Sequence, residues 1–431
     1  MLAAGTRLNR FGALNAAVNP TTPGYKALVC IFLFGGNDGG NTLIPINTPK
    51  NKYSDYFGVR GATLGIAQAS LAGIVASNGD TYGLHPNLAP LATLYSQNRV
   101  ALVANVGTLF KPILNKAQYQ NGTVQIPTNL FSHSDQQQQW QTTPGQRTGW
   151  GGRVADTLPA TAFPHGVSLA GNSLYLTGQS TTPASVTNGG LGLDGSDGSD
   201  ASNARDTAFQ QILSFNSGLS LIQTANKLMG DGIAAGKALN AALQSGGALT
   251  TVFPNTGLGQ QLQQVAQIMK VRQTLGLDRQ IFFATQGGFD THTGELPAHI
   301  QLFTELAGAM AAFDQALGND LMLRDQVVTF TESDFGRTFQ PSTGAGSDHA
   351  WGSHAIVTGP VIKADVYGQF MTLALNGPDD VSGRGVYIPS TSVDQYGATL
   401  ASWFGVPDSS LPTVFPNLNN FPAAQQKLGF L

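Results

Sequence analysis

Five short runs of almost continuous apolar residues constrain the fold of this 431-residue chain more than any other feature. They are KALVCIFLF (26–34), RVALVANVG (99–107), DRQIFFATQGG (278–288), DQVVTFTESDFG (325–336) and HAIVTGPVI (354–362). Runs of this length and composition are typical of strands buried on both faces, and hence of a parallel sheet. Helical patterns at 84–98, 296–318 and 393–405 alternate with them. The sequence therefore predicts an α/β sandwich with a mostly parallel central sheet.

The pattern along the whole chain suggests one domain, at 26–431, with an N-terminal tail at 1–25. Weaker strands are expected near 167–178, and a helical insertion near 204–277 that forms a cap or flap over the domain. The Asp- and Gly-rich stretch 187–203 could be a calcium loop or a flexible linker. It lacks a complete metal-loop spacing, which favours the linker.

Composition excludes some classes of function. The net charge is −3 without a basic patch, which excludes a nucleic-acid partner. No apolar stretch reaches about 18 residues, so no membrane span is expected. The single cysteine, Cys30, cannot form an intramolecular disulfide and is expected in the core. Charged residues are only 11%, and the N-terminus resembles the segment that comes after a cleaved export signal. We therefore expect a periplasmic or extracellular protein. The sequence does not indicate its oligomeric state.

Polar residues gather where the predicted strands end. The candidates for metal binding are Asp38, Asp290, His292, Asp334, His349 and His354. Ligands of α/β sheets bind outside the carboxyl ends of the strands, and carboxylates and imidazoles that converge there need a cation. Such a mixture suits one or two divalent ions, zinc first, with calcium or manganese as alternatives. A single Asp in a Gly-rich loop can instead form a turn.

A nucleophile is expected beside the metal, and Ser132 in NLFSHSDQQQQ is the candidate. It lies where a helix begins, and a nearby metal would lower the pKa of its hydroxyl. The alternative is an ordinary N-cap, with Ser134 as a rival for either role. His133 is expected to bond an oxyanion, to ligate, or to do neither. Arg337 is expected either to clamp an anionic ester or to pair with a carboxylate.

With these motifs in view, the chain resembles the sulfatase-like bacterial proteins catalogued as domain of unknown function 1501, in the alkaline phosphatase superfamily. The resemblance rests on LVCIFLFGGNDGGNTLIP, NLFSHSDQQQQW, GGFDTHTGELPAH, FTESDFGRT, GSDHAWGSHAIVTG and VDQYGATLASWFGV, between about residues 26 and 406. It implies a three-layer α/β/α sandwich and a two-metal site that hydrolyses phosphate or sulfate esters.

The resemblance also assigns roles to single residues. Asp38, Asp334 and the nucleophile Ser132 would hold one metal, and Asp290, His292 and His349 the other, with His354 as an alternative last histidine. Phe335 stands where the superfamily has a histidine ligand. The missing ligand would then come from His349 or Glu332, or the second metal would be weak or absent.

Three functions are compatible with the sequence. The first is an exported metal-dependent hydrolase of phosphate or sulfate esters, acting on a small molecule or a glycan. The second is a non-catalytic surface or matrix protein that binds glycan or self-associates, which Phe335 and the sparse charge favour. The third, a peptidase or carboxylesterase, is disfavoured because Ser132 lacks a G-x-S-x-G elbow.

Overall fold

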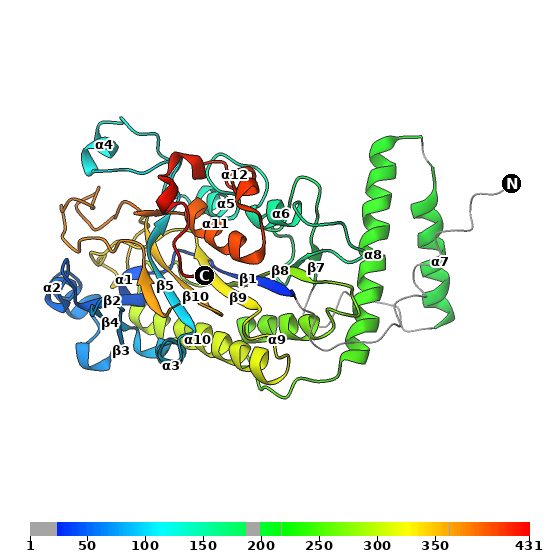
Figure 1. The fold of residues 1–431 in the computed structure, drawn as a ribbon, viewed down its shortest axis with the longest axis horizontal. Coiled ribbons are helices and arrows are strands. Elements are labelled where there is room, and N and C mark those ends of the chain that lie inside the picture. The colour runs from blue at the N-terminus through cyan, green and yellow to red at the C-terminus, as the bar shows by residue number, and fades with distance from the viewer. Residues whose placement is uncertain (1–23, 187–198, 217, 362) are drawn as a thin grey trace.

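A large mixed sheet forms the centre of the computed structural model, which describes residues 24–186, 199–216, 218–361 and 363–431 (Figure 1). Its strand order is β11-β5-β10-β9-β1-β8-β6-β7, and β12 pairs with β5. The strands are β1 (Lys26–Leu33), β5 (Val100–Gly107), β6 (Gly166–Ser168), β7 (Ala184–Ser185), β8 (Arg279–Gln286), β9 (Val327–Ser333), β10 (Ser353–Thr358), β11 (Asp365–Tyr367) and β12 (Thr391–Ser392). A smaller antiparallel sheet holds β2 (Leu43–Asn47), β4 (Thr81–Leu84) and β3 (Ala72–Val75). The α/β class with a mostly parallel sheet is thus confirmed.

Strand β10 is the exception to the parallel arrangement, because it pairs antiparallel with both β5 and β9. All five predicted strands exist, with bounds close to those expected. The expectation of strands across 167–178 was too broad, since only the short β6 forms there. The helix expected at 84–98 begins later. Residue 84 ends β4, and a 3₁₀ turn at Pro86–Leu88 precedes the α-helix.

Helices cover both faces of the sheet. The helices of the described chain are α1 (Gly39–Thr42), α2 (Tyr53–Leu64), α3 (Ala89–Ser96), α4 (Lys116–Gln120), α5 (His133–Thr142), α6 (Trp150–Ala155), α7 (Asp200–Ser214), α8 (Ser220–Gly246), α9 (Gly257–Lys270), α10 (Glu295–Asn319), α11 (Val393–Phe404) and α12 (Leu411–Val414), of which only some lie on the sheet. In Figure 1, α3, α9 and α10 lie along one face, and α6, α11 and α12 along the other.

Strand β1 shows why its apolar run is continuous. Its alternate residues enter two different cores: Val29 and Ile31 pack on the α9–α10 side, and Cys30 and Phe32 on the α6–α11 side. Both faces therefore exclude water, and no polar alternation is needed. Cys30 is buried and unpaired, as predicted.

The predicted helical insertion near 204–277 contains helices in two environments. Helix α9 is largely buried and packs against α10 and β8. Helices α7 and α8 form a hairpin beyond the β7 edge of the sheet (Figure 1), where α8 packs against β7 and α9 and α7 against α8. The expected tail at 1–25 and the loop at 187–203 lie mostly outside the described residues. Within the described part of the chain, no helix is long and apolar enough to cross a membrane.

Candidate metal centre

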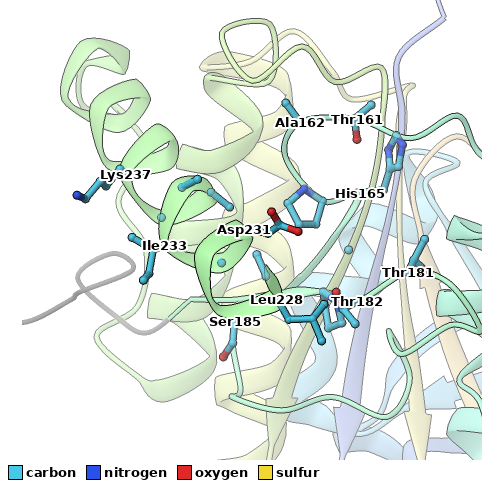
Figure 2. A pocket seen from close by; sticks show the side chains of 18 of the residues that line it. Thr161, Ala162, His165, Thr181, Thr182, Ser185, Leu228, Asp231, Ile233 and Lys237 are labelled. Atoms are coloured by element: carbon cyan, nitrogen blue, oxygen red, sulfur yellow. The ribbon is translucent and has the colours of Figure 1, made fainter. Parts of the chain in front are cut away.

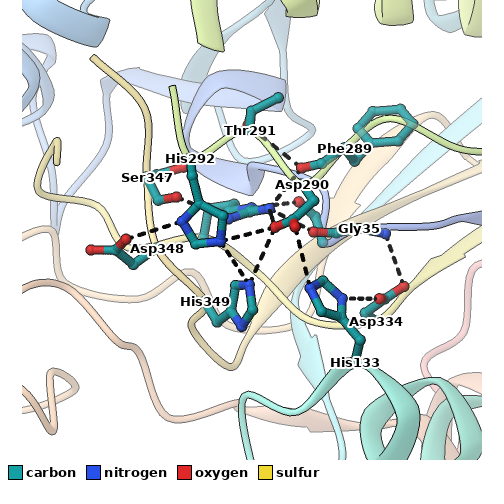
Figure 3. Close-up of polar contacts among 12 residues, drawn as sticks. Gly35, His133, Phe289, Asp290, Thr291, His292, Asp334, Ser347, Asp348 and His349 are labelled. Atoms are coloured by element: carbon teal, nitrogen blue, oxygen red, sulfur yellow. Dashed lines mark hydrogen bonds and ion pairs between the residues drawn. The ribbon is translucent and has the colours of Figure 1, made fainter. Parts of the chain in front are cut away.

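Acidic and imidazole side chains converge at the edge of the sheet where β1, β8 and β9 end (Figure 3). Asp290 and His292 follow β8, and Asp334 follows β9. His349 precedes β10, whose reversed direction brings this preceding loop to the same edge. His133 comes from the first turn of α5. The predicted convergence of these loops is therefore present.

The Asp290 carboxylate is the centre of the cluster. His292 Nε2 and His349 Nε2 lie 3.1 and 3.2 Å from its Oδ1. His133 Nε2 lies 3.5 Å from its Oδ2. The Asp290, His292, His133 and His349 side chains are 23–47% exposed, so a solute can reach them. Three ring nitrogens thus surround one carboxylate at an accessible edge of the protein.

The opposite nitrogen of each imidazole faces an acceptor. His133 Nδ1 lies 2.7 Å from Asp334 Oδ2, and His349 Nδ1 lies 2.7 Å from the Phe131 carbonyl. His292 Nδ1 lies 3.2 Å from Asp348 Oδ1. Acceptors at Nδ1 favour the tautomer whose lone pair is on Nε2, and such contacts are what orient metal-ligating histidines. All three rings therefore direct Nε2 toward Asp290, and in this tautomer a cation bound there would receive the three lone pairs.

This donor set fits one divalent ion. Ligand atoms of His133, Asp290 and His349 all lie within 4.8 Å of one another. His292 Nε2 is only 2.9 Å from His349 Nε2. Two lone pairs cannot bond each other, so either a proton or a cation must lie between these rings. Imidazole nitrogens with one carboxylate oxygen are typical zinc ligands.

Phe335 packs below this cluster. Its buried ring lies 4.9 Å from the His133 ring and 4.5 Å from the His349 ring, between centroids. The imidazole beside Phe335 is that of His133, which reaches the cluster from α5. Glu332 does not supply it. That carboxyl is buried beside Trp150 Nε1, at 3.1 Å, and Cys30, and burial raises its pKa to about 8.

Asp334 orients His133 and does not face open space. It is fully buried, and its Oδ1 accepts a hydrogen bond from the Gly35 N–H at 3.2 Å. Its Oδ2 also accepts one from Gln137 Nε2 at 2.8 Å. Asp334 is thus fixed from two sides, and it fixes the His133 ring in turn.

Arg337 is a structural support for Asp290. Its buried guanidinium donates to the carbonyls of Gly35, Gly36, Phe289 and Ser347, and to the Asp290 carboxylate. Burial alone would raise the pKa of Asp290, but this guanidinium holds it below its usual range. Of the two roles expected for Arg337, the structure supports pairing with a carboxylate. Because these bonds and burial occupy the guanidinium, it cannot also bind an anionic ester.

Asp38 lies in a different cluster. It is fully buried, accepts the Gly40 N–H at the start of α1, and receives two bonds from Arg60 at 2.6 and 2.7 Å. Glu295 and His299 lie nearby, with potential ligand atoms within 4.8 Å of Asp38. Burial would raise the pKa of Asp38, but Arg60 keeps it lowered. Arg60 thus supplies the positive charge that was expected from a metal.

The structure therefore does not bring Asp38 and Asp334 together, and no contact joins them among the described residues. The turn after β1 approaches the metal centre through its glycines instead. Gly35 has φ +115°, and a Cβ there would lie 2.3 Å from the Asp290 nitrogen. Only glycine fits such a close approach.

His354 is not at the metal centre either. It lies inside β10, buried, and its Nδ1 accepts the Asn105 N–H at 3.1 Å. Its ring packs on Phe370, 4.6 Å away between centroids, and burial lowers its pKa to about 4. The sequence predicted that this strand begins at residue 354, so His354 was expected beside the preceding loop. The strand begins one residue earlier, at Ser353.

Ser132 is the N-cap residue of α5, but its side chain makes no capping bond. Its Oγ donates to Asp135 Oδ2 at 2.7 Å and lies 3.2 Å from Ser134 Oγ. Among the described residues, no hydrogen bond joins its side chain to the histidine cluster, although it directly precedes His133 in the chain. On its other side is Phe131, whose carbonyl faces His349 and whose φ is +75°. A left-handed backbone at an aromatic residue is unusual and strained, and such strain gathers at functional sites.

Sequence reasoning missed three residues here. Gln137 has a detectable signal, since it lies one helical turn after His133 on the same face. Phe131 acts through its carbonyl, and Arg384 reaches Asp348 from a distant loop, at 2.6 Å. Neither has a signal in the sequence, because only the folded chain brings them to the cluster.

A separate groove of about 1470 Å³ lies between α8 and the loops around 155–166 and 176–185. Figure 2 shows its lining, which includes His165, Asp231 and Lys237. It shares no residue with the metal centre, and its described side chains do not form a ligand cluster. We therefore place the candidate site at the sheet edge.

Comparison with known proteins adds a family. The sequence profile described as Protein of unknown function (DUF1501) matches residues 25–383. No curated protein matches the chain.

Proposed function

We propose that this chain, which belongs to the DUF1501 family, is a metal-dependent hydrolase of phosphate or sulfate esters. One observation carries the proposal: three imidazoles, each with an acceptor at Nδ1, direct Nε2 toward one carboxylate, Asp290. Such an arrangement at the carboxyl edge of an α/β sheet, accessible to solvent, is what a catalytic metal requires. We further propose that the sandwich is alkaline-phosphatase-like, which the helices on both faces of the sheet support.

The residues support one metal in preference to two. His133, Asp290, His292 and His349 form one donor set, and Phe335 and the glycines after β1 close the space beside it. Asp38, the remaining candidate for a second ion, is neutralised by Arg60. Zinc is the ion that we propose, and when bound it would supply a positive charge to stabilise an ester oxygen.

The chain's own residues provide the rest of the reaction. The first turn of α5 has free N–H groups that suit an anionic group. Ser132, at the start of this turn, is the proposed nucleophile, and its hydroxyl already donates to Asp135. In the proposed step, Oγ bonds to the phosphorus or sulfur, its proton passes to Asp135, and the ester oxygen leaves. Water then hydrolyses the serine ester.

Metal content tests the proposal first. The full chain, purified without chelator and reloaded with zinc, is expected to hold about one equivalent by elemental mass spectrometry. Asp290→Asn and His349→Ala should lose it. His165→Gln should keep it, because His165 bonds only the backbone carbonyls of Arg279 and Pro159. No zinc in the wild type would contradict the proposal.

Activity is the second test. Zinc-loaded wild type should hydrolyse an aryl phosphate or an aryl sulfate, and Ser132→Ala should lose most of that rate. Ser134→Ala tests the rival hydroxyl, 3.2 Å from Ser132 Oγ, and should keep most of the rate. Equal rates in the Ser132 variant and the wild type would remove Ser132 from the mechanism.

A non-catalytic surface or matrix protein is the second candidate. The Asp38–Arg60 pair and Phe335 favour it, because both replace parts of a two-metal site. Bound zinc without hydrolysis of either ester, together with self-association, would support this candidate. Export to the periplasm or beyond belongs to both proposals and is tested by cell fractionation.

A further inference from the structure

The proposed substrates carry a negative charge, so the site needs a group that recognises an anion. Arg337, the arginine nearest to Asp290, cannot do so, because carbonyls and a carboxylate occupy its buried guanidinium. An exposed cation close to the metal centre would suit this role, in addition to the metal and the first turn of α5.

Arg384 is such a cation. Its Nη1 lies 2.6 Å from Asp348 Oδ2, and the other oxygen of that carboxylate lies 3.2 Å from His292 Nδ1. The guanidinium is thus one side chain away from a proposed metal ligand. The Arg384 side chain is 43% exposed, and Asp348 is the one side chain that its guanidinium contacts among the described residues. A guanidinium has five N–H donors in a planar fork, so most of them remain open to a solute.

The loop that presents Arg384 is held in place. The buried carboxylate of Asp380 accepts N–H bonds from Asn376, Ser382, Gly383 and Val386. The Arg384 carbonyl accepts the Gln340 N–H at 3.0 Å. Gly385 is next in the chain, at φ +79° and close against Phe339. Arg384 is therefore fixed at its backbone and needs only side-chain motion to meet a ligand.

We infer that Arg384 is the anion-recognition residue of this metal centre and binds a phosphate or sulfate group of the substrate. The inference rests on the proposed function. Its chemistry is ordinary: a guanidinium fork pairs two oxygens of a tetrahedral oxyanion. Asp348 has a positioning role, because it holds Arg384 on one side and His292 on the other.

Binding of inorganic phosphate and of sulfate to the zinc-loaded full chain, by calorimetry, tests this inference. Arg384→Gln should weaken binding of the preferred anion about tenfold or more. Arg384→Lys should recover part of the loss, because lysine retains the charge without the fork. Arg324→Gln is the matched control. Arg324 is 40% exposed and is also paired with an aspartate, Asp314, but lies outside the metal centre.

Zinc content measured on the same samples separates the outcomes. Weaker anion binding in Arg384→Gln, with zinc content unchanged, supports the inference. Equal anion affinity in Arg384→Gln and the wild type overturns it and leaves the hydrolase proposal standing. Loss of zinc in Arg384→Gln also overturns it, because the residue would then act on the metal centre through Asp348. A wild type without zinc defeats the proposed function and, with it, the assignment of Arg384 to a metal centre, even where anion binding still depends on Arg384.

Discussion

Replacing Asp38 distinguishes the two roles considered for this residue. The sequence predicted a metal ligand, and the structure shows the partner of the buried Arg60. Asp38→Asn keeps the shape of the side chain but leaves the Arg60 charge buried without its carboxylate. Breaking a buried ion pair in this way costs about 3–5 kcal/mol. Glu295 Oε1 lies 3.5 Å from Arg60 and can take over part of the pairing. We therefore expect a loss near the lower end, about 3 kcal/mol.

That loss should be visible in thermal unfolding. An unfolding entropy near 2.1 cal/mol/K per residue gives about 0.9 kcal/mol/K for this chain, so Tm should fall by about 3 °C. Zinc content should stay equal to the wild type. The double variant Asp38→Asn/Arg60→Met should lose less than the sum of the single variants, because it leaves no unpaired charge.

The exposed pair Lys427–Asp408 is the matched control. Lys427→Met should change stability by less than about 1 kcal/mol, because solvent screens surface pairs. If Asp38→Asn removes zinc, Asp38 is a metal ligand after all. If it keeps zinc and leaves Tm unchanged, the assignment of Arg60 as its neutralising partner is wrong.

Three further predictions concern the core, the turn after β1 and the metal. Burial raises the pKa of Glu332 from 4.5 to about 8. The folded chain therefore binds more protons than the unfolded chain between these values, and stability falls as pH rises. The difference in unfolding free energy between wild type and Glu332→Gln, from urea titrations at pH 5–8, should drop by about 1.4 kcal/mol per pH unit; a flat difference would show that Glu332 is ionised throughout. Gly35→Ala, with a Cβ against the Asp290 backbone, should cost more than about 1 kcal/mol and lower zinc content, as measured by urea unfolding and elemental analysis. If the variant keeps both its stability and its zinc, the loops that carry Gly35 and Asp290 can move apart at little cost in free energy. A chelator should lower the Tm of zinc-loaded wild type but not of His349→Ala, and equal shifts in both would place the zinc elsewhere.

The sequence predicted the sheet well because the strands are buried on both faces. The run KALVCIFLF is typical of a strand buried on both faces, and in the fold each of its faces meets a separate core. The same reasoning predicted that the loops carrying Asp290 and Asp334 would meet at one edge, because parallel strands end together. His349 joins them because β10 runs in reverse. Sequence reasoning could not show this reversal, because a buried run has no directional signal.

The pairing of Asp38 with Arg60 shows what the sequence could not predict. A carboxylate after a strand needs a positive charge, and the sequence cannot tell whether a metal or a distant arginine supplies it. Arg60 is 22 residues away on α2, with no spacing that points to Asp38. His133 shows the converse case. Its part in the cluster depends on α5 crossing beside β9, which only the fold determines.

Because β10 runs in the reverse direction, one continuous segment of the chain carries part of the metal centre. The chain leaves β9 and enters β10 at the same edge, so one connection at 334–352 holds Asp334, Arg337, Asp348 and His349. A bridge between Arg337 and His349 closes this connection on itself. Substitution of this one continuous stretch would therefore change one proposed ligand, His349, and three side chains that hold the others in place, while every strand of the sheet kept its partner. The proposed metal centre could thus be altered through this stretch alone, without redesign of the fold.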